Sequence, residues 1–407
     1  MKEQPELSDR MELPCGAVVN NRFLKSAMSE ILGSSEHSPT EELISLYSRW
    51  AEGNAGILVT GNVMIDEKAL GEPANVVISD DRNIELLKKW ADAGKKKGNH
   101  IFVQLNHPGK QSPKSLSPEP AAPSAIPLGK GLERFFATPR ELNENEIMGI
   151  IEKFAKSSEI VKKAGFTGVQ IHAAHGYLVS QFLSPLHNKR ADKWGGSLEN
   201  RMRFLIEIYD AIRKRTGPDF PVSVKINSAD FRRGGFTEEE AMVVLKTLDE
   251  KKIDLIELSG GSYESPVMTG KNMKSENEAY FLDIALKAKK ELRCPVAVTG
   301  GFRTSEAMKE AVALGKTDFI GIGRPMAVDP DLPEKILSGQ NYKSTVKPLS
   351  SGIKMIDRLA MLEITWYEYQ IGRIARNKET KPFENVWISM AKMFLGEGFF
   401  RFKRRRA

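Results

Sequence analysis

The sequence predicts an α/β fold consisting of a single (β/α)8 TIM barrel. Eight short apolar segments recur along the chain, and longer segments with the periodicity of amphipathic helices separate them. The apolar segments are rich in Val, Ile and Leu on both faces, as buried parallel strands are. The repeated strand-then-helix pattern with eight strands favours a barrel over an open doubly wound sheet. The pattern GxGxxG, expected after the first strand of a dinucleotide-binding open sheet, is missing here.

The eight apolar segments are the expected strands. They cover residues 23–28, 56–61, 100–105, 168–172, 222–227, 254–259, 295–300 and 318–323. The expected helices between them cover residues 40–53, 83–97, 143–164, 198–215, 237–251, 281–292 and 304–314. Several of these helices begin at a suitable capping residue. Ser38 or Thr40 precedes the first, and Thr237 precedes three glutamates whose charge favours a helix N-terminus.

One long segment interrupts the repeat. Residues 108–139 contain seven prolines with scattered Ser, Ala and Gly, so they cannot form a regular helix. Because this segment follows the third strand, we expect it to be an extended capping loop over the C-terminal mouth of the barrel, where active sites form. Its length favours a lid or a pocket wall over a plain surface loop.

The chain continues beyond the eighth strand. A helical pattern at 352–376 contains Trp366, Tyr367 and Tyr369, which are typical of a core or of a subunit contact. The expected parts are the barrel, a C-terminal helix that packs on the barrel or on a partner subunit, and an extension with a basic tail, over residues 1–345, 346–380 and 381–407.

Composition limits the function classes. The net charge is +7, but residues 401–407 carry five basic side chains and no acid, so no nucleic-acid partner is expected. Phe399, Phe400 and Phe402 lie among these charges, which leaves a membrane surface or RNA as an alternative role for the tail. No apolar run approaches the roughly 18 residues of a membrane span, and the N-terminus lacks the apolar region of a signal peptide. We therefore expect a cytoplasmic protein.

The two cysteines, Cys15 and Cys294, exclude a disulfide framework or a four-cysteine cluster within this chain. The segment with the most candidate functional residues follows the fourth strand instead. His172 and His175 are three residues apart, and Tyr177 follows. Residues at the end of a barrel strand are where catalysts lie. The histidines could also satisfy buried hydrogen bonds or bind a metal, although no acidic residue occurs in the segment before Asp192.

The run HAAHGYLVSQFLSP, followed by NKRADKWGGSLENRMRF, resembles the signature of the Old Yellow Enzyme family of FMN-dependent oxidoreductases. The resemblance extends in register over roughly residues 10–340 and includes NRFLKSAM, FVQLNHPGK, VKINSADF, VTGGF and GIGRPMAVDPDL. It implies an FMN-dependent ene-reductase that takes hydride from NADH or NADPH and reduces α,β-unsaturated carbonyl compounds. It also implies a small-molecule substrate and a homo-oligomer.

The resemblance assigns roles to individual residues. His172 and His175 are expected to donate hydrogen bonds to the carbonyl oxygen of the substrate, and Tyr177 to protonate its α-carbon as the general acid. His172 is also expected to contact the flavin. The other expected flavin contacts are Ala27, Met28, Ser29, Gly61, Gln104 and Lys225, and the expected phosphate site is Gly300, Gly301, Gly323 and Arg324. No metal is expected.

Four residues depart from the family pattern. Ala27 stands where proline is frequent, Ser29 where threonine or cysteine is common, and Lys225 where many members have arginine. A lysine can still stabilise an anionic reduced flavin, without the bidentate geometry of arginine. Ile31 replaces a tyrosine found in some bacterial members, so the pocket wall is expected to differ, and the resemblance does not fix the substrate preference.

Other readings remain open from the sequence. A dienoyl-CoA reductase or an amine-oxidising relative would need iron–sulfur cysteines and a second nucleotide-binding unit. A flavin-dependent tRNA dihydrouridine synthase would generally use a cysteine acid. A non-catalytic flavin-binding protein would bind flavin without turnover. A phosphate-binding lyase or isomerase barrel would leave Gln104 and the His–His–Tyr set unexplained.

Overall fold

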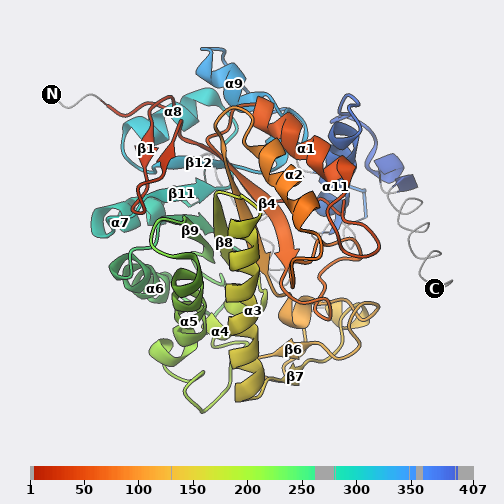
Figure 1. The fold of residues 1–407 in the computed structure, drawn as a ribbon, viewed down its shortest axis with the longest axis vertical. Coiled ribbons are helices and arrows are strands. Elements are labelled where there is room, and N and C mark those ends of the chain that lie inside the picture. Colours follow the sequence, from red (N-terminus) through yellow and green to blue (C-terminus); the bar gives the residue numbers. More distant parts are fainter. Residues whose placement is uncertain are drawn as a thin grey trace.

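Eight parallel strands close into a barrel in the computed structural model (Figure 1). The structure describes residues 4–129, 131–261, 279, 281–347, 349–353, 361–389 and 391–392. The barrel strands are β3 (Phe23–Lys25), β4 (Ile57–Met64), β5 (His100–Asn106), β8 (Gly168–Ala173), β9 (Val222–Asn227), β10 (Leu255–Ser259), β11 (Val296–Thr299) and β12 (Phe319–Ile322). β12 pairs with β3 and closes the circle. The predicted barrel is confirmed, and the open sheet is excluded.

Helices on the outside of the barrel follow the strands. They are α1 (Glu41–Glu52), α2 (Ile84–Gly94), α3 (Glu144–Lys163), α5 (Leu198–Thr216), α6 (Glu238–Glu250), α7 (Leu282–Glu291) and α8 (Ser305–Ala313). Thr40, and not Ser38, caps α1 by accepting a hydrogen bond from the backbone of Leu43. Thr237 and Glu240 form a reciprocal capping box at the start of α6. The seven helices expected from the sequence are all present.

The N-terminal end of the barrel is closed by a small hairpin. Strands β1 (Met11–Glu12) and β2 (Val18–Val19) pair antiparallel there. Leu13 and Val19 join an apolar cluster with side chains from the barrel strands, including Phe102. Burial of these apolar groups closes this end of the barrel. The opposite, C-terminal end therefore remains as the place for a site.

The segment after β5 contains only short elements. It holds 3-10 helices at Gly109–Gln111 and Leu132–Arg134 and the two-residue strands β6 (Ala121–Ala122) and β7 (Arg140–Glu141). Its described part has no α-helix, as its prolines predict. It lies at the lower right of the barrel in Figure 1.

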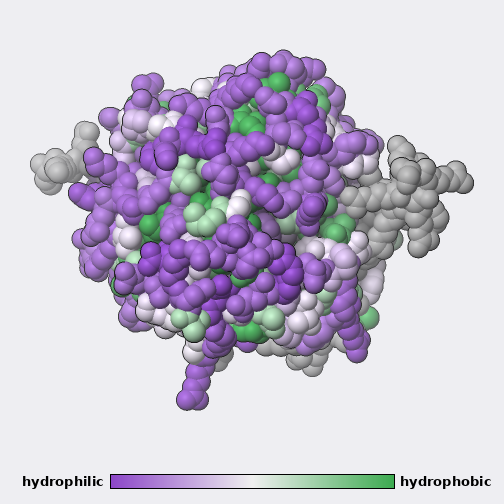
Figure 2. Space-filling model, turned by 60° about the horizontal axis from the view of Figure 1, so that its bottom comes forward, coloured by the Kyte–Doolittle hydropathy of each residue, from purple (hydrophilic) through white to green (hydrophobic). Residues whose placement is uncertain are grey.

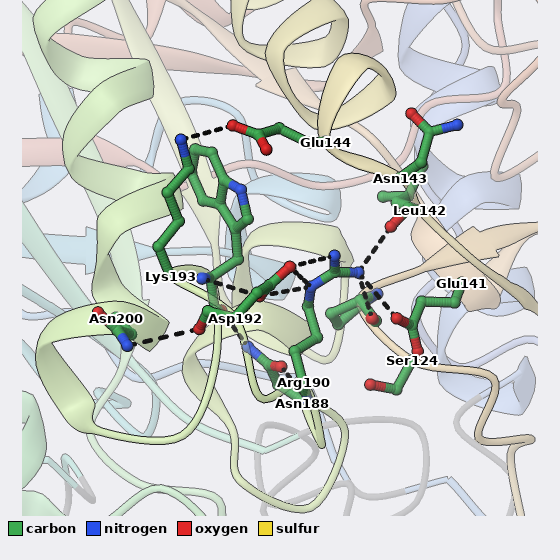
Figure 3. A network of polar contacts seen from close by, with 12 residues as sticks. Ser124, Glu141, Leu142, Asn143, Glu144, Asn188, Arg190, Asp192, Lys193 and Asn200 are labelled. Atoms are coloured by element: carbon green, nitrogen blue, oxygen red, sulfur yellow. Dashed lines mark hydrogen bonds and ion pairs between the residues drawn. The ribbon is translucent and has the colours of Figure 1, made fainter.

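Arg190 clamps this capping loop to the chain that follows α4 (Leu178–Leu183). Its guanidinium donates hydrogen bonds to the carbonyl oxygens of Pro123 and Leu142, at 3.1 and 2.6 Å, and pairs with Asp192 at 2.6 Å. Figure 3 shows Arg190 at the centre of this network. The side chain is only 7% exposed, so these contacts form where little water competes. Much of the sequence NKRADKW is therefore structural.

The C-terminal part packs on the barrel. After α9 (Leu332–Leu337), helix α11 (Met361–Ala375) lies against α1, as Figure 1 shows. Ile371 and Ile374 join the main core, and Arg376 pairs with Glu42 of α1 at 3.0 Å. Residues 354–360 of the expected helical pattern and the basic tail, residues 401–407, lie outside the described residues.

The face shown in Figure 2 is mostly hydrophilic, with small apolar patches between polar side chains. Among the residues that the structure describes, no helix is long and apolar enough to cross a membrane.

Candidate active site

A pocket opens at the carboxyl ends of the barrel strands, with an empty volume of about 1510 Å³ that includes its open mouth. The strand ends supply its polar side chains, because parallel strands all end at this face. Of the thirteen site residues predicted from the sequence, twelve line this pocket. They are Ala27, Met28, Ser29, Gln104, His172, His175, Tyr177, Lys225, Gly300, Gly301, Gly323 and Arg324.

His172, His175 and Tyr177 form one wall of the pocket. The ring of His172 lies 4.8 Å from that of Tyr177 and 5.2 Å from that of His175, centre to centre, and both pairs meet edge to face. His175 has a φ of 61°, and the following Gly176 a φ of 79°. This left-handed turn is costly for a histidine, and such strain is often found at functional sites. The backbone N–H of His175 donates to Asn227, which stabilises the turn.

Both histidines are neutral. Burial, together with the nearby Lys225 ammonium, lowers the pKa of His175 to about 3. The pKa of His172 is well below its usual value, because its ring is buried and because His175 and the Lys225 ammonium lie nearby. Nδ1 of His172 accepts a hydrogen bond from the backbone of Ala174 at 3.3 Å, so the ring proton lies on Nε2. His172 can therefore donate a hydrogen bond through Nε2 without adding a charge.

A belt of buried polar side chains crosses the barrel interior beneath the pocket. Gln104 donates to Gln170 at 2.8 Å, and Gln170 donates to Glu257 at 2.8 Å. Glu257 also pairs with Lys225 at 2.9 Å and accepts a hydrogen bond from Thr299 at 2.7 Å. The bond from Gln104 to Gln170 and the ion pair of Lys225 with Glu257 hold these two pocket side chains in fixed positions at the pocket floor.

The far end of the pocket contains a glycine pair and a cation. Gly300 and Gly301 have φ angles of 122° and 94°, which L side chains rarely adopt. Gly323 and Arg324 follow β12, and Arg324 pairs with Glu363 of α11 at 2.7 Å. Glycine backbone and a guanidinium suit an anionic group at this position.

Comparisons with known proteins agree with this geometry. Residues 16–343 match the NADH:flavin oxidoreductase / NADH oxidase family. The chain belongs to this family. An NADH-dependent flavin oxidoreductase of Aspergillus parasiticus, nadA, is 41% identical over 339 residues, covering 79% of this chain and 76% of that protein.

Two further similarities extend the comparison. A solved structure of an Old Yellow Enzyme homologue from Zymomonas mobilis has a TM-score of 0.72 and 26% identity to this chain, covering 84% of this chain and 95% of that one. A cinnamate reductase of Clostridium sporogenes is 32% identical over 364 residues, covering 82% of this chain and 52% of the relative. The resemblance to the Old Yellow Enzymes is confirmed.

FMN and NAD(P)H are accordingly the cofactor and the hydride donor of this flavin oxidoreductase, and the pocket residues fit FMN. The amide of Gln104 would pair with the pyrimidine edge of the flavin, and Lys225, which lines the same pocket, would supply a cation. The glycine pair and Arg324 offer an anion site for the phosphate at the other end. Among the described residues, no group of three or more His, Cys, Asp or Glu side chains could hold a metal ion.

Gly61 is the exception among the predicted residues, because it does not line the main pocket. A Cβ on Gly61 would lie 2.5 Å from the carbonyl oxygen of Met28, and its N–H donates to Glu30 at 2.7 Å. The glycine therefore permits close packing of β4 behind the turn that carries Met28, and not the approach of a flat ring. Ile31 faces a separate small cavity and is not among the residues that line the main pocket, so its expected effect on the pocket wall stays a prediction.

The capping loop is not the pocket wall that its length suggested. None of its described residues, 108–129 and 131–139, lines the main pocket. Gln111 instead supports the left-handed turn at His175 by donating to the carbonyl oxygen of His175 at 3.1 Å. The wall comes from the C-terminal part, with Lys347, Ile364 and Tyr367.

Sequence reasoning missed three acidic residues at or beside the site: Glu72, Glu257 and Glu363, the partner of Arg324. Glu72 lines the pocket and accepts a hydrogen bond from the hydroxyl of Ser29. It lies in a loop with no recognisable pattern. Glu257 was detectable in principle, because it is the single charged side chain within the apolar run of β10.

Proposed function

We propose that this oxidoreductase is an ene-reductase, which uses hydride from NAD(P)H to reduce the activated C=C bond of α,β-unsaturated carbonyl compounds. The observation that carries the proposal is the wall formed by two neutral histidines and a tyrosine, which faces the same pocket as Gln104 and Lys225. Bound FMN supplies the hydride transfer, and the protein supplies placement and electrostatics.

The histidines are suited to binding a carbonyl oxygen. As neutral rings, each can present one N–H donor where negative charge develops during reduction. His172 has its proton on Nε2, because Nδ1 already accepts from the backbone. The two ring centres lie 5.2 Å apart. Nε2 of His175 already contacts the hydroxyl of Ser259 at 2.9 Å, so Nδ1 is the nitrogen of His175 that would serve the carbonyl oxygen. This arrangement polarises the carbonyl group and makes the β-carbon electrophilic.

Tyr177 is suited to the general-acid role. A phenol is protonated at neutral pH and can transfer its proton to the α-carbon as the double bond is reduced. Its ring contacts His172, so the acid and the carbonyl-binding donor lie on the same wall. The cinnamate reductase relative gives independent support, because cinnamate has a C=C bond conjugated to a carboxyl group.

Other readings of the site have less support. Neither Cys15 nor Cys294 lines the pocket, so the cysteine acid of a tRNA dihydrouridine synthase has no counterpart among its lining residues. Burial raises the pKa of both thiols, which makes them poor proton donors. A small-molecule substrate fits the family, and assembly into a homo-oligomer stays a prediction.

Anaerobic stopped-flow absorbance tests the proposal. Mixing the holoprotein with NADH or NADPH should bleach the flavin band, and subsequent mixing with 2-cyclohexenone should restore it. Bleaching without recovery, across several enones and enoic acids, would contradict ene-reduction while leaving the flavin oxidoreductase assignment intact. Bound flavin that no nicotinamide reduces would indicate a non-catalytic flavin-binding protein.

A further inference from the structure

Glu257 is a buried carboxylate that the proposed reaction does not use. It lies in the middle of β10 with its side chain fully buried, and it does not line the pocket. Three donors converge on it from three strands: Lys225 of β9 at 2.9 Å, Thr299 of β11 at 2.7 Å and Gln170 of β8 at 2.8 Å. A buried charge is tolerated only when it is paired and hydrogen-bonded in this way.

The carboxylate is held in its ionised form. Burial by itself raises the pKa of Glu257, but Lys225 and the hydrogen bonds from Thr299 and Gln170 outweigh it and leave the pKa below its ordinary value. An ionised carboxylate can only accept hydrogen bonds. The partners of Glu257 must therefore all be donors, and this fixes which group donates and which accepts in each hydrogen bond of the belt.

The same order of donors and acceptors continues through Gln170 to Gln104 at the pocket floor. Because Gln170 must turn its NH2 group to Glu257, its carbonyl oxygen faces Gln104. Gln104 must in turn direct its own NH2 group to Gln170, at 2.8 Å. The carbonyl oxygen of Gln104 is then the group available to accept a hydrogen bond from a ligand in the pocket.

We propose that Glu257 is a positioning residue for the cofactor. Glu257 lowers the reduction potential of bound flavin, because it partly neutralises the charge of Lys225. It also orients Gln104 so that the Gln104 carbonyl oxygen accepts a hydrogen bond from the flavin ring. Lys225 lies at the pocket, where a full positive charge stabilises an anionic reduced flavin. The carboxylate 2.9 Å behind it offsets part of that charge. Since the inference concerns bound FMN alone, it does not depend on enone reduction.

The test is the two-electron reduction potential of FMN in the Glu257→Gln holoprotein, measured by anaerobic dye equilibration. Removing the negative charge should raise the potential. We expect at least a tenfold higher ratio of reduced to oxidised flavin at a fixed potential, which corresponds to about 30 mV for a two-electron couple. FMN affinity, measured by fluorescence of released flavin, should also fall, because the Gln170 and Gln104 amides lose their fixed direction.

Asp254, which lies immediately before the strand that contains Glu257, provides a matched control. It is a buried carboxylate that pairs with Arg213 at 2.6 Å, immediately before β10 and away from the pocket. Asp254→Asn should lower stability without moving the potential. If Glu257→Gln leaves the potential as unchanged as Asp254→Asn does, the inference is wrong and Glu257 serves only the fold.

Two more variants separate the proposed role from a structural one. Glu257→Asp keeps the negative charge, but the shorter side chain places it farther from Lys225. The reduction potential of flavin in this variant should therefore lie between those of the wild type and Glu257→Gln. This variant carries the test if Glu257→Gln does not fold. In a Lys225→Met background, Glu257→Gln should change the potential little, because an unpaired buried carboxyl group becomes neutral. An equal shift in both backgrounds would overturn the role through Lys225.

Discussion

Replacing Tyr177 with phenylalanine removes one oxygen atom from the proposed general acid. The ring remains, so its edge-to-face contact with His172 at 4.8 Å is retained. The side chain is only 8% exposed, which leaves little room for a water molecule to take over the proton transfer. The variant therefore isolates the proton-transfer step.

General-acid catalysis contributes typically 10²–10⁴-fold to a rate. Because each tenfold change corresponds to 1.36 kcal/mol, the barrier for reduction of 2-cyclohexenone should rise by about 3–5 kcal/mol. The shielding of Tyr177 from solvent places the expected loss at the upper end of that range. Flavin reduction by nicotinamide should change less than threefold, because no proton from Tyr177 is needed in that step.

Stopped-flow absorbance measures both half-reactions on the same sample. Tyr209→Phe is the matched control, because the Tyr209 hydroxyl donates to the backbone of Lys251 on the outside of the barrel. It should leave both rates unchanged. An equal loss in the two half-reactions of Tyr177→Phe would refute the acid assignment and indicate a disturbed pocket instead.

Three further predictions concern stability, pH and specificity. Arg190→Ala should reduce the free energy of unfolding by about 3 kcal/mol, since it leaves the carbonyl oxygens of Pro123 and Leu142 without their donor. Arg215→Ala, at an exposed ion pair, should cost less than about 1 kcal/mol in chemical denaturation. Similar losses in the two variants would contradict the clamp. The pKa of His175 is lowered to about 3 in the folded protein, so as the pH falls below about 6.5 the unfolded chain takes up a proton on His175 before the folded protein does. The free energy of unfolding should therefore decrease as the pH drops from about 6.5 toward 3. A melting temperature that does not depend on pH in this window would contradict a neutral buried ring. Glu72→Gln should lower the ratio of the KM for cinnamate to the KM for 2-cyclohexenone by roughly tenfold, because it removes a negative charge that repels the cinnamate carboxylate from the pocket wall. An unchanged ratio would place Glu72 away from the bound acid.

The strands and helices were predictable because their signals are local. Each barrel strand lies in a short segment rich in apolar side chains, and Thr237 with Glu240 forms the capping box that the sequence indicates. The grouping of His172, His175 and Tyr177 on one pocket wall was equally accessible, since they lie within six residues at a strand end.

Other parts of the site depend on closure of the barrel, which no local pattern records. Lys225 and Glu257 are 32 positions apart and meet only because β9 and β10 are neighbours in register. Tyr367 reaches the pocket because α11 folds back against α1. Gly61 was placed at the flavin by its position after a strand, but the backbone of Met28 occupies the space beside it.

The anchoring of the capping loop by Arg190 bears on how this loop can change in evolution or in the laboratory. The bonds to Pro123 and Leu142 divide a long connection into shorter spans with fixed ends. For a span with fixed ends, each doubling of length costs only about 0.6 kcal/mol in closure entropy. Insertions between the anchor points should therefore be inexpensive, and new surface features could be grafted there while the barrel and its pocket keep their geometry.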